Sequence, residues 1–213
     1  PSCFWTVFCI IKIMKILKTV PTIEVKRTFV ISNFGKIKGN QKGVSEKIFA
    51  NKLEKAKSKV LKFSEKDLDK HIEWPKRLES YNNSDWYIAK FSPSELGPWR
   101  RASGLPLRWT NRSLKETSQK INKVLGTSSD ILKKRSRYSI YNMLESPSQL
   151  KQNEKYLYPI VFKNDTGTRG RSYLRFKTKA DIDDGCMRSI AMAISGRDPI
   201  TVYFGVPKKN LKK

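Results

Sequence analysis

The sequence has little histidine and little cysteine. Its 213 residues include one histidine, His71, and three cysteines, Cys3, Cys9 and Cys186. Because the cysteine count is odd and no two are spaced C-x-x-C, we expect free thiols, which suit a reducing compartment, rather than a disulfide framework. One histidine also leaves too few ligands for a Cys/His zinc site. We therefore expect no metal and no cofactor.

Catalytic motifs are equally scarce. His71 has no evident nucleophile partner, and the G-x-x-x-x-G-K-S/T phosphate loop is absent. Asp181, Asp183 and Asp184 would suit a metal-dependent nuclease, but acids are also expected where a helix starts. On such a helix only Asp181 and Asp184 would share a face. The sequence predicts a protein that is not an enzyme and has no small-molecule substrate.

Long hydrophobic runs are missing too. The apolar run at residues 3–11 is shorter than the roughly 20 residues that cross a bilayer, so we expect no membrane span. From Met14 the sequence MKILKTVPTIEVKR is basic and acid-poor and resembles an organelle import sequence, which implies a mitochondrial location. A basic first strand over residues 22–31 is the other interpretation. A cytoplasmic or nuclear location is the alternative.

Acidic residues are few beside basic ones. The chain has 19 Asp and Glu against 44 Lys and Arg, a net charge of +25. Its hydrophobic content of 38% is adequate for folding. A compact domain with this charge repels itself and is best tolerated beside a polyanion. We expect nucleic acid, with an anionic membrane or an acidic protein as alternatives.

The basic residues concentrate in two stretches. Residues 97–115 read GPWRRASGLPLRWTNRSLK, and residues 133–137 read KKRSR. Arginine forks pair with phosphates, and tryptophans stack on unpaired bases or anchor a loop to its domain. The candidate RNA contacts in the two stretches are Arg100, Arg101, Arg108, Trp109, Arg112, Lys133, Lys134, Arg135 and Arg137.

A third stretch, RGRSYLRF at residues 169–176, resembles the octamer of RNA recognition motif domains. Gly170 and Phe176 match that pattern, whereas the third position holds Arg171 in place of an aromatic residue. Strand alternation would place every second residue on one face, and in that family this face binds bases. The resemblance adds Arg169, Arg171, Tyr173 and Arg175 as candidate contacts.

Periodicity predicts an α+β fold. Strands are expected at residues 86–91, 156–163, 172–177 and 200–206, and helices at 44–63, 113–125, 130–144 and 179–194. Ser64 and Asp67 predict the cap of a further short helix. The order fits a ferredoxin-like βαββαβ plait with insertions, a small antiparallel sheet with helices on one face. We divide the chain into a basic N-terminal extension (1–43), a basic helical segment (44–75) and an α+β nucleic-acid-binding domain (76–213).

Long basic loops beside a small α/β body resemble ribosomal proteins, and the import-like segment is similar to those of mitochondrial ribosomes. This resemblance of general character implies a structural RNA-binding protein of a large ribonucleoprotein, with rRNA and neighbouring ribosomal proteins as partners. A free nucleic-acid-binding factor and an RNA-processing or nuclease-type enzyme remain the alternatives.

Overall fold

The computed structural model describes residues 14–36, 43, 45–145, 150–151, 154–169 and 178–208. Its strands form one mixed six-stranded sheet in the order β1-β2-β6-β4-β5-β3. The strands are β1 (Lys15–Val20), β2 (Ser84–Phe91), β3 (Leu96–Gly97), β4 (Ile160–Lys163), β5 (Ala180–Asp184) and β6 (Ile200–Pro207). The β4/β6 and β3/β5 pairs are parallel, and the other pairs are antiparallel. The α+β class is confirmed. The plait is not, because this sheet is mixed and has more strands than a plait.

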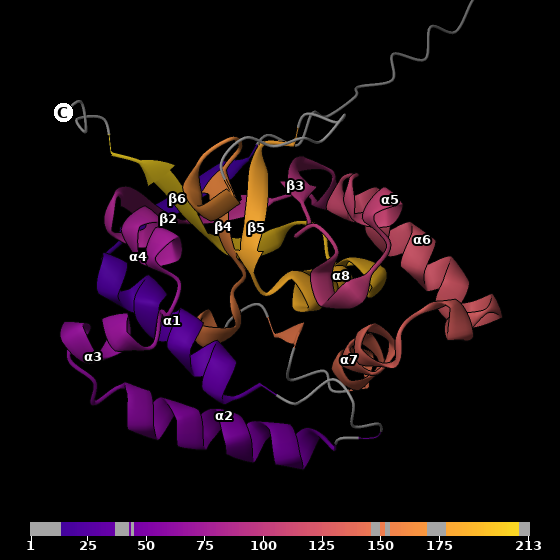
Figure 1. Cartoon of the computed structure of the whole chain (residues 1–213), viewed down its shortest axis with the longest axis horizontal. Helices are drawn as coiled ribbons and strands as arrows, with labels where there is room; N and C mark the ends of the chain where they lie inside the picture. The colour runs from indigo at the N-terminus through magenta and orange to yellow at the C-terminus, as the bar shows by residue number, and fades with distance from the viewer. Residues whose placement is uncertain are drawn as a thin grey trace, which may run out of the picture.

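Helices cover both faces of the sheet (Figure 1). They are α1 (Thr22–Phe34), α2 (Glu46–Val60), α3 (Glu65–Lys70), α4 (Pro75–Asn82), α5 (Leu107–Thr110), α6 (Leu114–Thr127), α7 (Lys134–Leu144) and α8 (Cys186–Ile194). Strand alternation builds two cores: Val202 and Phe204 face α5–α8 in the first, and Tyr203 faces α1–α4 in the second. The expectation of helices on one face is therefore wrong. Within the described residues, none of the helices combines the length and apolar character needed to cross a bilayer.

Elements with strong local signals lie where the sequence predicts them. The strands expected at residues 86–91 and 200–206 are β2 and β6, and the helices expected at 44–63, 113–125 and 130–144 are α2, α6 and α7. Ser64 caps α3 in a reciprocal capping box: its hydroxyl accepts from the Asp67 N–H, and the Asp67 carboxylate accepts from the Ser64 N–H. These elements carry their own start signals or apolar periods, so they need little tertiary context.

The first correction concerns residues 22–31, which form helix α1 rather than a strand. Pro21 stands at the N-cap in an extended conformation, and the acidic residue Glu24 lies in the first turn, where it complements the helix dipole. Lys26 breaks the apparent alternation because it is buried, with Nζ 2.8 Å from the Glu65 carboxylate on α3. The helix is buried around much of its circumference, so its sequence shows neither a clear helical periodicity nor a clear strand alternation.

The second correction concerns residues 179–194, expected as one helix. They form β5, a turn at Gly185 and then α8. Gly185 has φ 81°, a left-handed conformation that glycine adopts readily, and a Cβ there would lie 3.2 Å from Cα of Pro159. The strand expected at 156–163 is confined to β4 and follows the 3-10 helix η5 (Lys155–Leu157). The strand expected at 172–177 lies outside the described residues.

Candidate functional site

The loop that follows β3 is held in a fixed shape against α5 and α7. Arg101 and Ser103 adopt left-handed backbone conformations, with φ 52° and φ 49°. The Arg101 N–H donates to Thr110 Oγ1 at 2.9 Å. The Ser136 hydroxyl on α7 donates to the Ser103 carbonyl at 2.6 Å. These two bonds join the loop to α5 on one side and to the first turn of α7 on the other.

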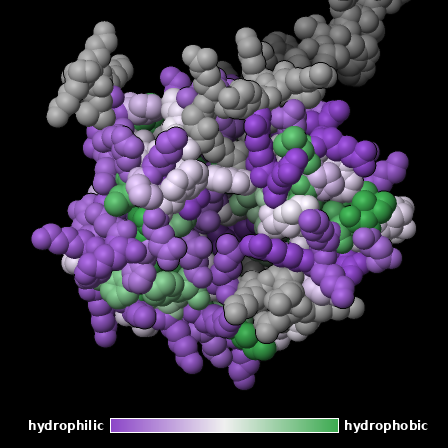
Figure 2. Space-filling view, in the orientation of Figure 1, coloured by the Kyte–Doolittle hydropathy of each residue, from purple (hydrophilic) through white to green (hydrophobic). Residues whose placement is uncertain are grey.

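This arrangement brings together the two basic stretches that the sequence predicts as RNA contacts. A Cβ on Gly104 would lie 3.0 Å from Cδ of Lys133, so the loop and the start of α7 touch. The two segments contain eight exposed cations, and we call six of them the basic surface: Arg100, Arg101, Arg108, Lys133, Lys134 and Arg135. Figure 2 shows hydrophilic side chains over much of the visible face of the molecule, with hydrophobic patches among them.

Two other predicted contacts form ion pairs. Arg112 Nη1 lies 3.1 Å from Oε1 of Glu116, and Arg137 Nη1 lies 2.6 Å from Oδ1 of Asp130. The bond to Asp130 raises the pKa of the Arg137 guanidinium. Glu116 and Asp130 are the only acids in residues 97–137. The segment thus has no further acid to offset the cations of the basic surface.

Trp109 does not fit its expected role. Its side chain packs in the first core and is 4% exposed, so neither face of the ring is available to stack on a base. Its hydrophobic environment explains the burial, and Trp109 is removed from the set of RNA contacts. Trp99, at the start of the same loop, is half-buried and packs edge-on against Trp74 with ring centroids 6.2 Å apart.

The octamer-like stretch is not placed. Arg171, Tyr173 and Arg175 lie outside the described residues. Arg169 closes the 3-10 helix η6 (Gly167–Arg169), and its side chain lies outside the described part of the chain. The resemblance to an RNA recognition motif therefore stays a prediction.

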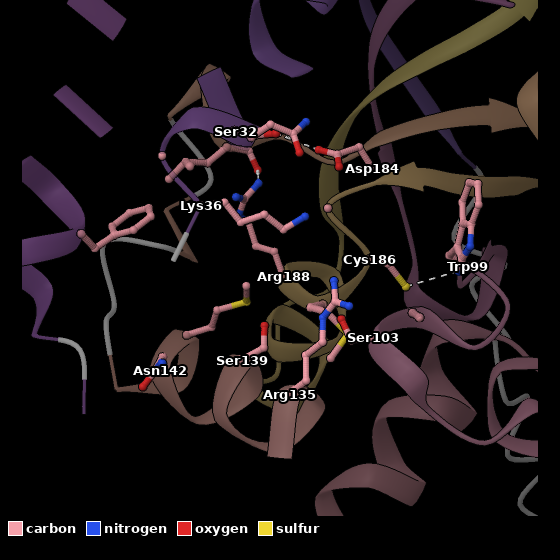
Figure 3. Close-up of a pocket in the computed structure, with 18 of the residues that line it drawn as sticks. Ser32, Lys36, Trp99, Ser103, Arg135, Ser139, Asn142, Asp184, Cys186 and Arg188 are labelled. Carbon is pink, nitrogen blue, oxygen red and sulfur yellow. Dashed lines mark hydrogen bonds between the residues drawn. The ribbon is translucent and has the colours of Figure 1, made fainter. Parts of the chain in front are cut away.

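A cavity of about 730 Å³ lies beside the basic surface, and sequence reasoning missed it. It opens where the parallel strands β3 and β5 end, the edge at which α/β sheets commonly bind ligands. Its walls come from the end of α1, one face of α2, the loop after β3, α7 and the turn into α8. Figure 3 shows Ser32, Lys36 and Arg188 on one side of the cavity, and Ser103 and Arg135 on the other.

One wall of the cavity contains a buried ion pair. The Asp183 side chain is 1% exposed and accepts from Arg77 Nε at 2.9 Å and from Arg77 Nη2 at 3.2 Å. The Tyr81 hydroxyl also donates to it at 2.9 Å. Burial raises the pKa of Asp183, and the Arg77 guanidinium opposes that rise. The Arg77 guanidinium thus offsets part of the desolvation that favours the neutral form of this carboxyl group.

A second cluster lies at the turn into α8. Asp184 accepts from the Ser32 hydroxyl at 2.8 Å. Arg188, 8% exposed, donates from Nη1 to the Leu157 carbonyl at 3.0 Å. Burial lowers the pKa of Arg188, and the charge of Asp184 opposes that shift. The acid run at 181–184 hinted at a site, but Arg188 carried no signal, since an arginine inside an apolar helix pattern usually faces solvent.

The pair of acids considered for a nuclease is separated. Asp181 and Asp184 were expected to share a helix face, but β5 places them three positions apart on a strand, so they point to opposite faces. Asp181 is 3% exposed and accepts from the Thr178 hydroxyl at 3.4 Å. Within the described ranges, no three acids, cysteines or histidines gather closely enough to hold a metal ion.

The chain was compared with known protein families, curated proteins and solved structures. No family model matches it, and no curated protein or solved structure matches it either.

Proposed function

We propose that this protein binds RNA through the basic surface, as a structural component of a large ribonucleoprotein, with a mitochondrial ribosome as the particle. One observation carries the proposal: two cationic stretches that are separate in sequence lie on one surface. Residues 97–137, which contain both stretches, include only two acids, and both of these form ion pairs. Arginine and lysine grouped in this way bind phosphates with little regard to sequence. The net charge of +25 supports the same partner.

The shape of the surface supports RNA contact as well. Hydrogen bonds fix the loop after β3 to α5 and α7, so its cations are presented by a shaped backbone rather than by a flexible tail. Less side-chain and loop ordering is then required when RNA binds, which raises affinity for the same number of contacts.

Removing the basic surface should weaken RNA binding and its salt dependence. The variant replaces Arg101, Lys133 and Lys134 with alanine. Each lost phosphate contact lowers the slope of log K against log salt by about 0.7 for single-stranded RNA, so three lost contacts flatten it by about 2 units. The measurement is fluorescence anisotropy with a labelled RNA, from about 50 to about 200 mM salt.

The matched control removes three exposed lysines at the opposite edge of the sheet: Lys15 and Lys18 on β1, and Lys90 on β2. It makes the same change in net charge and should leave most of the slope intact. Equal slopes for the two variants would mean that binding follows total charge, and the basic surface would lose its assigned role.

Membership of a particle is a separate prediction. Tagged protein from its own cells, run through a density gradient, should co-migrate with one ribosomal subunit. It should stay with that subunit when magnesium chelation separates the two halves. Migration at the top of the gradient, together with retained RNA affinity, would favour a free RNA-binding factor instead.

A further inference from the structure

The cavity meets the N-terminus of α8, a helix of nine residues. The first turn of a helix has backbone N–H groups without helical partners and carries a partial positive charge. At α8 the N-cap residue is Gly185, which has no side chain to accept from them. Gly185, Cys186, Met187 and Arg188 all line the cavity, so this first turn faces its interior.

Arg188 gives an independent reason to expect an anion. Arg188 is 8% exposed and lines the cavity, yet its Nε has no hydrogen-bond partner among the described residues. A buried donor of a charged group is costly to leave unsatisfied. Nη1 of the same guanidinium donates to the Leu157 carbonyl. An anionic oxygen in the cavity would supply the missing acceptor.

The charges around the cavity favour an anion despite its two acids. Asp183 is engaged by Arg77 at 2.9 Å. Asp184 is offset by Arg188 and accepts from Ser32. Lys36, just after α1, and Arg135 on α7 then remain, both exposed and lining the cavity. The sum is two positive charges beside a helix N-terminus, an arrangement that binds phosphate groups.

We propose that this cavity binds a phosphate group carried by a single nucleotide, with the phosphate at the first turn of α8 and with Arg188, Lys36 and Arg135 around it. The volume of about 730 Å³ exceeds what a phosphate needs and lies in the usual range for small-molecule sites. The apolar walls, including Trp99, Phe49 and Leu53, suit a nucleoside. The nucleotide is either the phosphorylated end of an RNA, which rests on the function proposed above, or a free nucleotide.

The first test is isothermal titration calorimetry of the full chain with adenosine 5′-monophosphate, with adenosine as the comparison. The second compares a short RNA bearing a 5′-phosphate with the same RNA bearing a 5′-hydroxyl. We expect the phosphate to strengthen binding by at least about tenfold in one or both pairs. Preference in the RNA pair alone identifies an RNA end, and preference in the mononucleotide pair identifies a free nucleotide.

Variants assign the effect to the cavity. Lys36→Ala/Arg135→Ala changes two exposed residues and should remove most of the phosphate preference, whereas Lys15→Ala/Lys18→Ala on β1 should keep it. Ser139→Phe, which fills the cavity from α7, should abolish it. The proposal is overturned if phosphate gives no preference in either pair, or if the preference survives both cavity variants. Phosphate preference without RNA binding would refute the proposed function and leave this site standing.

Discussion

Replacing Arg77 with methionine is expected to lower the free energy of unfolding by about 3–5 kcal/mol, because it leaves a buried carboxylate without its cation. The Asp183 side chain is 1% exposed. Without Arg77, its carboxylate would keep the hydrogen bond from the Tyr81 hydroxyl but would have lost its ion pair. The guanidinium also stacks on Phe29, 4.9 Å from the ring centroid, and that contact would be lost as well. Urea denaturation followed by tryptophan fluorescence measures the change.

The loss should depend on pH in a defined direction. Burial raises the folded-state pKa of Asp183 above its ordinary value of 3.8. At pH values between the unfolded-state pKa and the folded-state pKa, the folded protein therefore binds more protons than the unfolded chain. Stability from this group is therefore lost as pH rises through the folded pKa. Removing Arg77 raises that pKa further, since the guanidinium opposes the shift. The deficit of Arg77→Met should thus be smaller at about pH 5 than at about pH 8.

Two further variants separate the ion pair from general effects. Arg108→Met changes an exposed arginine on α5 and should alter the unfolding free energy by less than about 0.5 kcal/mol. Asp183→Asn combined with Arg77→Met removes the stranded charge and should recover part of the stability. If the free energy of unfolding of Arg77→Met lies within about 1 kcal/mol of that of the native chain, the Asp183 carboxylate does not depend on Arg77 for its stabilisation.

Replacing Trp86 with alanine should cost about 3–5 kcal/mol, the range for a large aromatic side chain removed from a core. Trp86 is 3% exposed, and its indole Nε1 donates to the Tyr81 carbonyl at 3.0 Å. Its ring packs against Phe162 with centroids 5.1 Å apart and covers Gly205 so closely that a Cβ there would lie 2.9 Å away. Gly205, the residue paired with Trp86 on β6, has no side chain that could fill the space. Thermal and urea unfolding report the loss.

Trp74→Ala is the matched control. Trp74 is 40% exposed at the start of α4, where it stacks on Arg77 with 5.4 Å between the guanidinium and the ring centroid. Its removal should cost about 1 kcal/mol. A Trp86 variant no less stable than the Trp74 variant would show that the second core tolerates a cavity at this position.

The elements predicted correctly are those whose signals are local. The Ser64 capping box, the apolar stripe of α2 and the alternation in β2 and β6 lie within short windows of sequence. The errors come from residues whose state depends on distant partners. Lys26 is buried because α3 supplies Glu65. Asp183 sits on a strand rather than a helix start because β5 pairs with β4 and β3, and its carboxylate is buried beside Arg77, 106 positions earlier. No local window contains either partner.

The features of the candidate site also divide into those that the sequence predicts and those that depend on packing. Composition locates the cations of residues 97–115 and 133–137, since charge is visible without structure. Their meeting on one surface depends on the bond between Ser136 and Ser103, which sequence does not reveal. The burial of Trp109 and the orphaned Nε of Arg188 are likewise properties of packing. Residue type therefore predicts a polyanionic partner, whereas the cavity could be located only from the fold.

The position of β6 has a consequence for biosynthesis. This strand lies between β2 and β4 in the middle of the sheet, yet it follows every other described strand along the chain. While the polypeptide is emerging, β2 and β4 both lack a neighbour, and their unsatisfied backbone groups are open to pairing with other nascent chains. The molecule therefore completes its fold only after residues 200–207 have been released, and its vulnerable period is the interval before that strand inserts.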